Sequence, residues 1–169
     1  MKKESYIHRI PRCNNMPIHA LSCSTTASGL HDLDLIIKSL EWLCDKKEIV
    51  KLEKTTSFHG SPITLLKVKL SRSQSRLTLS RLGGNVLQSL ITEKNERLDD
   101  ENRLHFRLSQ NELVMGKIRL ANGNEDIVKM TAKIEVYPGE KPHDVLLKLL
   151  SESLERCTRR GWLESPPLL

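Results

Sequence analysis

The stretch ITLLKVKL, residues 63–70, carries the pattern that decides the fold. Successive side chains of a β-strand point to opposite faces of a sheet. Three apolar residues then share one face, and two lysines share the other with a single leucine: Leu66, Val68 and Leu70 on the first, Lys67, Lys69 and Leu65 on the second. This alternation predicts a strand that packs on a core with one face and leaves the other face cationic.

Three later stretches repeat the alternation: RLHFRL (103–108), GKIRL (116–120) and IVKMTAKIEVY (127–137). If the four strands join one sheet, their apolar faces pack under helices and the opposite face is basic. The cations of that face would be Lys67, Lys69, Arg103, Arg107, Lys117, Arg119, Lys129 and Lys133, with Glu135 the one acid beside them. Like charges directly opposite each other destabilise a sheet. The excess therefore favours an anionic partner over a face that meets only water.

Other segments supply the rest of the fold. They are two strands (16–27 and 48–55), two amphipathic helices (30–45 and 143–157) and a helical region (72–92). We expect a break in that region at Gly83-Gly84, since adjacent glycines cost a helix about 2 kcal/mol relative to alanine. The Asn-Gly pair in ANGNE (121–125) predicts a tight hairpin. The expected fold is α+β: a two-layer sandwich with an antiparallel or mixed sheet, helices on one face and a basic open face.

The 169 residues predict a single domain from 16 to 157, preceded by a disordered basic tail (1–15) and followed by a flexible tail (158–169). A chain of this length can bury about two-thirds of its unfolded surface without a metal or disulfide. No apolar run approaches the roughly 20 residues of a membrane span. The N-terminal lysines are not followed by the apolar segment of a secretory signal. We therefore expect a cytoplasmic protein with no membrane partner.

Charge is distributed unevenly along the chain. The formal net charge is +6, and none of the 21 acids lies between Thr55 and Thr92. Arg72 and Arg76 fall in this segment four residues apart, so on a helix they share a side and would extend the cationic face. At this point three partners remain open: a nucleic acid, an acidic protein or membrane surface, or water alone.

Aromatic content indicates which nucleic acid such a face would suit. Base stacking on single strands needs exposed aromatic side chains, and aromatic residues are only 4% of this chain. Phe106 is expected in the core and Trp42 in the first helix, and no G-x-x-G clamp occurs. We therefore expect salt-sensitive contacts to the phosphate backbone of structured or double-stranded RNA rather than single strands.

Three segments in order carry a family resemblance: EKTTSFHGSPITLLKVKLSR (53–72), RLDDENRLHFRLSQNELVMGKIRL (97–120) and IVKMTAKIEVYPGEK (127–141). With them the chain resembles, over about residues 17–152, the archaeal RNA-binding protein family described as a predicted exosome subunit. The matching residues are Gly60, Pro62 and Ile63 in the first segment, Leu98, Asp99 and Arg107 in the second, and Ile134, Glu135, Tyr137 and Pro138 in the third.

The resemblance implies the fold of the 5S-RNA-binding ribosomal protein of the large subunit, RNA binding, and association with RNA-processing proteins. One turn departs from the family pattern. Where the family usually shows an Asp-Lys-Gln-like triplet, this chain has Ser109-Gln110-Asn111. The turn has lost its lysine, although Gln and Asn can still hydrogen-bond a phosphate or a sugar.

The remaining polar groupings predict no catalysis and no metal site. His59-Gly60-Ser61 lacks a nucleophile elbow and an orienting acid, and Asp99-Asp100-Glu101 lacks the ligand spacing of a calcium loop. Arg159-Arg160 is read either as a phosphate contact or as a solubilising pair. We expect a non-catalytic RNA-binding protein that uses the basic face with Arg72 and Arg76. The alternative is an accessory subunit of an exosome-like, RNA-processing assembly whose basic face meets an acidic protein.

Overall fold

The computed structural model describes residues 17–167. The segment 1–15, expected to be a disordered basic tail, lies outside the described residues. The strands of the described part are β1 (Ile18–Ser28), β2 (Lys51–Thr56), β3 (Pro62–Leu70), β4 (Arg103–Ser109) and β5 (Ile127–Ile134). Its helices are α1 (Leu33–Cys44), α2 (Arg72–Arg81), α3 (Gly84–Thr92), α4 (Lys94–Arg97), α5 (Gln110–Val114) and α6 (Pro142–Arg159).

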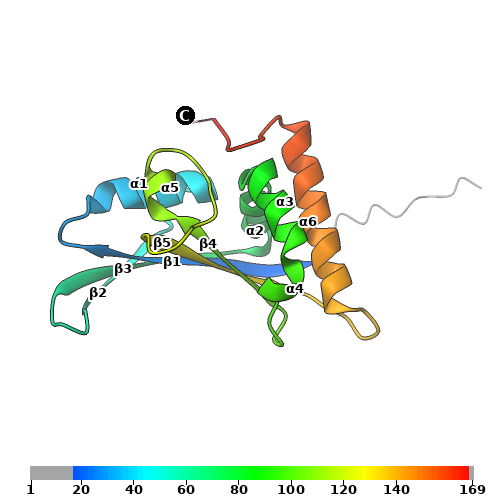
Figure 1. Ribbon diagram of the computed structural model, residues 1–169, viewed down its shortest axis with the longest axis horizontal. Helices are drawn as coiled ribbons and strands as arrows, with labels where there is room; N and C mark the ends of the chain where they lie inside the picture. Colours follow the sequence, from blue (N-terminus) through cyan, green and yellow to red (C-terminus); the bar gives the residue numbers. More distant parts are fainter. Residues whose placement is uncertain (1–16, 168–169) are drawn as a thin grey trace, which may run out of the picture.

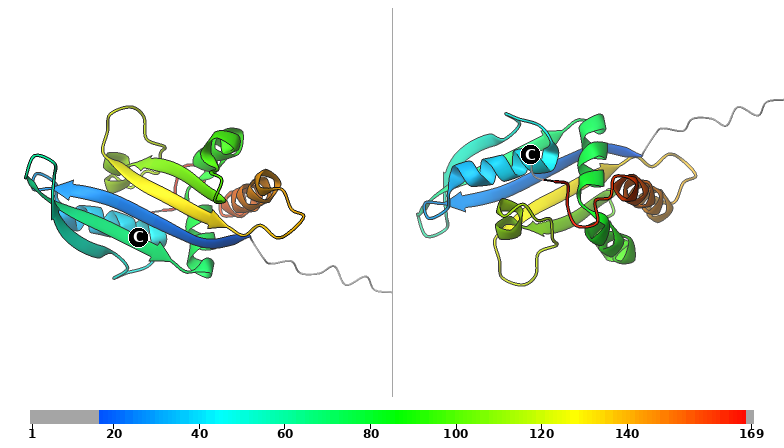
Figure 2. Two further views of the ribbon diagram at one scale, coloured as in Figure 1. Left: turned by 90° about the horizontal axis from the view of Figure 1, so that it is seen from below. Right: turned by 90° about the horizontal axis from the view of Figure 1, so that it is seen from above.

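The strands form one antiparallel sheet in the order β2-β3-β1-β5-β4. The longer helices lie on one side of it (Figure 1), and from the opposite side the strands are uncovered (Figure 2). α1 and α5 cover one end of the sheet, while α2, α3 and α6 cover the other. The predicted two-layer α+β sandwich is confirmed, and its sheet is fully antiparallel.

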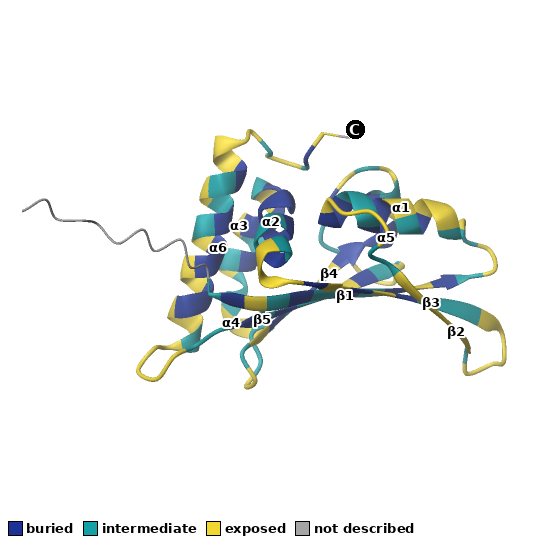
Figure 3. Ribbon diagram, turned by 180° about the vertical axis from the view of Figure 1, so that it is seen from behind, coloured by how far each residue is buried: buried dark blue, intermediate teal, exposed yellow. Residues whose placement is uncertain are grey.

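The alternating pattern that predicted the strands also predicts which face is buried. Leu66, Val68 and Leu70 of β3 are buried, as is Phe106 of β4. Figure 3 shows the buried residues where the helices face the sheet and one another. Burying each such side chain stabilises the fold by about 1.5–3 kcal/mol, so these strands can orient in only one way. Within residues 17–167, no helix has the length and apolar character needed to cross a membrane.

Arg81 accounts for one cation of the acid-free segment. Its side chain is buried, its Nε donates to the Leu43 carbonyl at 3.2 Å, and an Nη donates to the Trp42 carbonyl at 2.7 Å. Burial lowers the pKa of this guanidinium, and the Asp45 carboxylate at 3.8 Å opposes that shift. Because these carbonyls end α1, Arg81 caps a helix and is not available to a ligand.

The glycine pair separates α2 from α3, as predicted, and the C-terminal segment lies against it. Gly83 has φ +88°, and a Cβ there would meet the Glu164 carbonyl oxygen at 2.2 Å. The Gly84 N–H donates to the Trp162 carbonyl at 3.0 Å, which satisfies one of the free donors that begin α3. Residues 160–167, part of the expected flexible tail, therefore contact the helix layer; their flexibility stays a prediction.

The prediction that segment 116–120 is a strand of the sheet is wrong. Only Leu120 makes a bridge, to Leu108, and residues 121–125 are a loop rather than a tight hairpin. The chain cannot run straight from β4 into this segment, since α5 intervenes and is followed, two residues after its last residue Val114, by Gly116 with φ +77°. An alternating pattern forms a strand only where a neighbouring strand pairs with its backbone groups, and here a single bridge is present.

The sequence analysis also missed α5, which begins at the Ser109-Gln110-Asn111 turn. The Ser109 hydroxyl accepts from the Glu112 N–H and caps the helix. The buried Gln110 donates from Nε2 to the Thr25 hydroxyl at 2.6 Å and to the Thr26 carbonyl at 3.1 Å. The glutamine therefore anchors α5 to β1, and its amide nitrogen is engaged within the fold.

Candidate nucleic-acid interface

One row of side chains on the uncovered face crosses all five strands. In the order β2-β3-β1-β5-β4 it consists of Lys51, Lys67, Ser24, Lys129 and Arg107, each directly opposite the next. We call these five residues the cation row. With neighbouring strands about 4.8 Å apart, its backbone positions span about 19 Å. Four of its five members are cations, so the row places two positive charges on each side of a central serine.

The central strand contributes only small side chains to this face. We call Ala20, Ser22, Ser24 and Thr26 the seam; they alternate with buried residues of β1. On one side of the seam, Lys69 lies opposite Ser22; on the other, Lys133 lies opposite Ala20. Long cationic side chains therefore stand on both sides of a line of short ones. A polyanionic strand laid along β1 would meet lysines from both neighbours.

The cations of this face differ in what they contact. Lys67 is 2.6 Å from the Glu53 carboxylate, Arg103 is 2.5 Å from that of Glu101, and Lys133 donates to the Glu101 carbonyl. Among residues 17–167, four further cations have neither an ion pair nor a side-chain hydrogen bond: Lys51, Lys69, Arg107 and Lys129. Exposed pairs such as Lys67–Glu53 contribute about 0–1 kcal/mol, so a phosphate can displace the carboxylate at little cost.

A hollow of about 480 Å³ lies at the β4 end of the cation row and is lined by residues including His105, Asp99 and Arg107. His105 Nε2 is 2.6 Å from an Asp99 carboxylate oxygen, and its Nδ1 is 3.4 Å from the Thr131 hydroxyl. The hydrogen bond from His105 lowers the pKa of the Asp99 carboxyl, with help from two backbone N–H groups. Both ring nitrogens are thus engaged, and neither is placed to act as a free general base.

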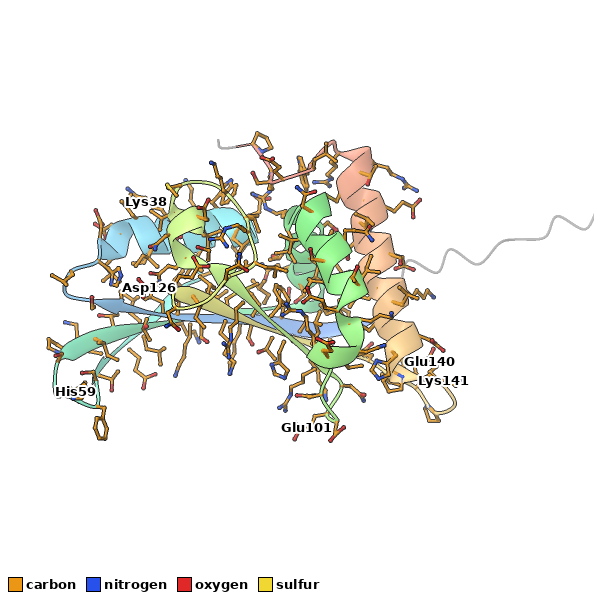
Figure 4. All side chains as sticks on the ribbon, in the orientation of Figure 1. Lys38, His59, Glu101, Asp126, Glu140 and Lys141 are labelled. Atoms are coloured by element: carbon orange, nitrogen blue, oxygen red, sulfur yellow. The ribbon has the colours of Figure 1, made fainter. Side chains whose placement is uncertain are left out.

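Three loops project beyond the sheet on its uncovered side, as the labelled His59, Glu101 and Glu140 show in Figure 4. Two of them carry aromatic side chains that the sequence analysis did not place at the face: Phe58 is 99% exposed and Tyr137 is 56% exposed. A fully exposed Phe in a turn has no packing role, so it is a candidate for stacking on a base. Its position in the polar turn TSFHGSP was the available signal.

Six of the predicted contact residues lie on the uncovered face: Lys67, Lys69, Arg103, Arg107, Lys129 and Lys133. Lys51 also lies on this face. The sequence analysis missed it because it predicted a strand at 48–55 without assigning the side chains of that strand to either face of the sheet. Lys117 and Arg119 do not join them, because segment 116–120 lies with α3 and α5 on the helix side. Placing these two on the sheet face was wrong.

Arg119 is instead held by a carboxylate within its own loop. Its guanidinium is 3.0 Å from Glu125, which also accepts from the Ser109 hydroxyl at 2.6 Å and from the Asn122 N–H at 2.5 Å. These hydrogen bonds, led by that from Ser109, lower the pKa of Glu125 to about 2. The loop thus neutralises its own cation, whereas the cation row does not.

The two helical arginines, Arg72 and Arg76, are not members of the cation row. Arg72 pairs with Glu135, which lies just beyond the end of β5. Arg76 lines a separate hollow between α2 and α6. Across residues 17–167, no three or more His, Cys, Asp or Glu side chains gather where they could hold a metal ion.

Comparison with known proteins identifies a family whose model matches this chain. A family model described as RNA binding matches residues 21–134, which is most of the sheet and its connections. No curated protein matches the chain. The matched region includes β2 to β5, β1 from residue 21 onward, and the whole of the cation row.

Solved archaeal structures share the fold. A protein of Methanothermobacter thermautotrophicus described as DUF54 superposes with a TM-score of 0.67 at 23% identity, covering 81% of this chain and 98% of its own. A protein of Archaeoglobus fulgidus, also described as DUF54, gives 0.65 at 19%, with 80% and 99% covered. One of Sulfolobus solfataricus gives 0.59 at 14%, with 79% and 98% covered. At these identities the likeness establishes the fold only.

Proposed function

Because the chain belongs to the family whose model is described as RNA binding, we propose that it binds structured RNA without catalysing a reaction. The open face of the sheet holds the phosphate backbone through the cation row, assisted by Lys69, Arg103 and Lys133. The observation that carries the proposal is the row itself: four cations in register across five strands. Phosphate contacts of this kind supply affinity and position, and little sequence selectivity.

Repulsion between the like charges of the cation row destabilises the unbound protein, and this supports a role for the row in binding an anionic ligand. Lys51 lies directly opposite Lys67, and Lys129 directly opposite Arg107. Cross-strand like charges destabilise a sheet by a few tenths of a kcal/mol to about 1 kcal/mol. Only Lys67 of these four has a carboxylate partner within the described residues. A face that met only water would gain stability from acids at some of these positions.

The composition of the face supports structured RNA over single strands. The strands present serines, a threonine and cations outward, while the exposed aromatics Phe58 and Tyr137 stand on loops at the rim. Sheet-based readers of single strands stack two or three bases on aromatics in the strands themselves. Here a duplex backbone can lie on the seam while a rim aromatic meets an unpaired base.

The same charges suit one other partner. An acidic surface of a protein in an RNA-processing, exosome-like assembly would also satisfy the row, and the protein would then be an accessory subunit. Direct binding separates the two cases: the purified protein binds a structured RNA hairpin if the row serves RNA, and it binds the acidic partner but not the hairpin if the row serves a protein.

The test is fluorescence anisotropy of a labelled RNA hairpin over a series of salt concentrations. The wild type is compared with Lys67→Gln/Lys129→Gln and with Lys38→Gln/Lys46→Gln, which removes two exposed lysines that line a hollow beside α1 and α5. We expect the face variant to bind about tenfold more weakly near 0.1 M salt. The slope of log affinity against log salt should fall by about 2, close to 0.9 per lost phosphate contact.

Two results would contradict the proposal. If the hairpin does not bind even at low salt, the face does not serve RNA. If the helix-side control loses as much affinity as the face variant, binding follows net charge and not the row.

A further inference from the structure

The hollow at the β4 end of the cation row lies where an RNA on the uncovered face would reach it. Its volume of about 480 Å³ is within the range of small-ligand sites. Its lining includes Glu96, Leu98, His105, Arg107, Ala121 and Lys129. We call it the β4 hollow. Because Arg107 and Lys129 belong both to the cation row and to this lining, the two features are continuous.

The backbone of β4 is exposed along the edge that borders the hollow. β4 is the last strand of the sheet, and in an antiparallel pair every second residue turns its backbone polar groups away from the partner strand. The Arg103 carbonyl accepts from the Asp99 N–H at 3.0 Å, and the Arg107 carbonyl accepts from the Ala121 N–H at 2.9 Å, so these groups face away from β5. His105 lies midway between Arg103 and Arg107, and its backbone groups therefore face the same way.

Two of these edge groups remain open, the His105 carbonyl and the Arg107 N–H. Neither has a hydrogen-bond partner among residues 17–167. The loop contacts of Asp99 and Ala121 cover the edge before and after them. An open strand edge invites a further hydrogen-bonding partner. This gap is too short for another strand, and it suits a small flat group that carries a donor beside an acceptor.

The side chains around the gap suit the rest of a nucleotide. The ring of His105 is fixed by the Asp99 carboxylate at 2.6 Å. Arg107 and Lys129 have no ion pair and no side-chain hydrogen bond among residues 17–167, so both are available to a phosphate. The Glu96 carboxylate also has no such partner within this range, and as an ionised acid it can only accept hydrogen bonds.

The group that matches this arrangement is a base with an amino group. Adenine offers an amino donor beside a ring-nitrogen acceptor, which complements the open carbonyl and N–H of β4. Its second amino hydrogen suits the Glu96 carboxylate, whereas uracil has only carbonyl oxygens and a ring N–H to offer. Leu98 and Ala121 add apolar surface for the ring. Proteins that read RNA sequence take up unpaired bases in this way.

We propose that the β4 hollow binds one unpaired adenine base, with the phosphate of the same nucleotide on Arg107 and Lys129. The protein would then select structured RNA in which a bulge or loop places an adenosine beside a duplex. This rests on the proposed function, because the flanking duplex would lie on the cation row. The row supplies affinity whatever the sequence, and the hollow adds a preference for one kind of unpaired base.

The experiment compares three labelled hairpins by fluorescence anisotropy: a fully paired stem, the same stem with one bulged adenosine, and the same stem with one bulged uridine. We expect the wild type to bind the bulged-adenosine hairpin about tenfold more tightly than the paired one, the effect of one or two net hydrogen bonds. The bulged-uridine hairpin should bind within about twofold of the paired one. It controls for the added flexibility of a bulged stem.

Three variants test the hollow and the edge. Ala121→Phe fills the hollow and should bind all three hairpins as the wild type binds the paired one. Arg107→Pro removes the edge N–H, which a strand at the edge of a sheet tolerates, while Arg107→Gln removes the charge alone. The glutamine variant should bind more weakly and keep the preference for adenosine, and the proline variant should lose the preference.

Lys51→Gln/Lys67→Gln is the matched control, because both lysines lie on the cation row and neither lines the hollow. It should weaken binding of all three hairpins and keep the tenfold ratio. Thermal unfolding checks that each variant is folded. If Ala121→Phe or Arg107→Pro is not folded, the wild-type comparison of the three hairpins still decides the inference.

Equal wild-type affinity for the three hairpins would overturn the inference and leave the proposed function intact. A bulged uridine that binds as tightly as the adenosine would overturn it too, because the preference would then reflect a bendable stem. So would a preference that survives in folded Ala121→Phe. Adenosine monophosphate, titrated by calorimetry, is the second ligand: if it binds while the hairpins do not differ, the hollow serves a free nucleotide and its assignment to RNA is wrong. If no hairpin binds, it is the proposed function that fails.

Discussion

The open face of the sheet and the loop 115–126 both carry cations, but they differ in what surrounds those cations. On the open face, Lys129 and Arg107 lie side by side with no carboxylate partner among the described residues. In the loop, Arg119 is held by Glu125. The first arrangement costs stability and leaves charge available to a ligand. In the second arrangement the cation is neutralised by an ion pair within the fold. The difference teaches that binding and stability should respond in opposite ways to mutation in the two regions.

The largest expected effect is on RNA affinity. Lys67→Glu/Lys129→Glu reverses two charges of the cation row, and we expect hairpin affinity near 0.1 M salt to fall on the order of 100-fold. Thermal unfolding should stay close to that of the wild type, because the new carboxylate at 129 lies opposite Arg107, while the one at 67 lies opposite Lys51 but loses the ion pair with Glu53. A variant that unfolds early would show that the row supports the fold instead.

The next effect is on stability alone. Gln110→Ala removes the side chain that anchors α5 to β1, leaving the Thr25 hydroxyl and Thr26 carbonyl without that partner. We expect the free energy of unfolding to fall by about 2 kcal/mol. Hairpin affinity should stay within about twofold, since Gln110 is buried beneath the helices. Denaturant unfolding and anisotropy measure the two quantities, and a loss of affinity in the folded variant would show that this turn takes part in binding.

The third prediction concerns pH. The folded pKa of Glu125, about 2, lies below the ordinary value of 4.5. The ionised carboxylate therefore stabilises the folded state above pH 4.5, and that contribution is lost as pH falls from 4.5 toward 2. Glu125→Gln should have a lower melting temperature than the wild type at pH 7, and the two should converge near pH 2. Asp99, whose pKa is also lowered, contributes in the same direction, so the difference between variants is the quantity to follow.

Much of this organisation could be predicted from sequence, and the failures share one cause. Strands β3, β4 and β5 were placed by alternation, and their apolar faces could pack only toward the helices. Segment 116–120 alternates as well, yet α5 and Gly116 redirect it, and no local pattern shows that a ladder partner is missing. The place of Lys51 in the cation row depends on strand register, which brings together residues far apart in sequence.

The smallest expected effect is a difference in stability between substitutions of two cations on the same strand, β5. Lys129 and Lys133 lie two residues apart on β5 and on the same face, but Lys133 donates to the Glu101 carbonyl whereas Lys129 faces Arg107 without a carboxylate. Lys129→Gln should therefore raise the free energy of unfolding by about 0.5 kcal/mol, and Lys133→Gln should leave it unchanged or lower it. Both should weaken hairpin binding and reduce the salt slope by about 0.9. Opposite signs in stability with equal signs in binding would mean that the open face is kept cationic for its ligand, at the expense of the sheet. If Lys129→Gln is instead destabilising, the cost assigned to the cation row does not exist, and the strongest physical argument for an anionic partner is lost.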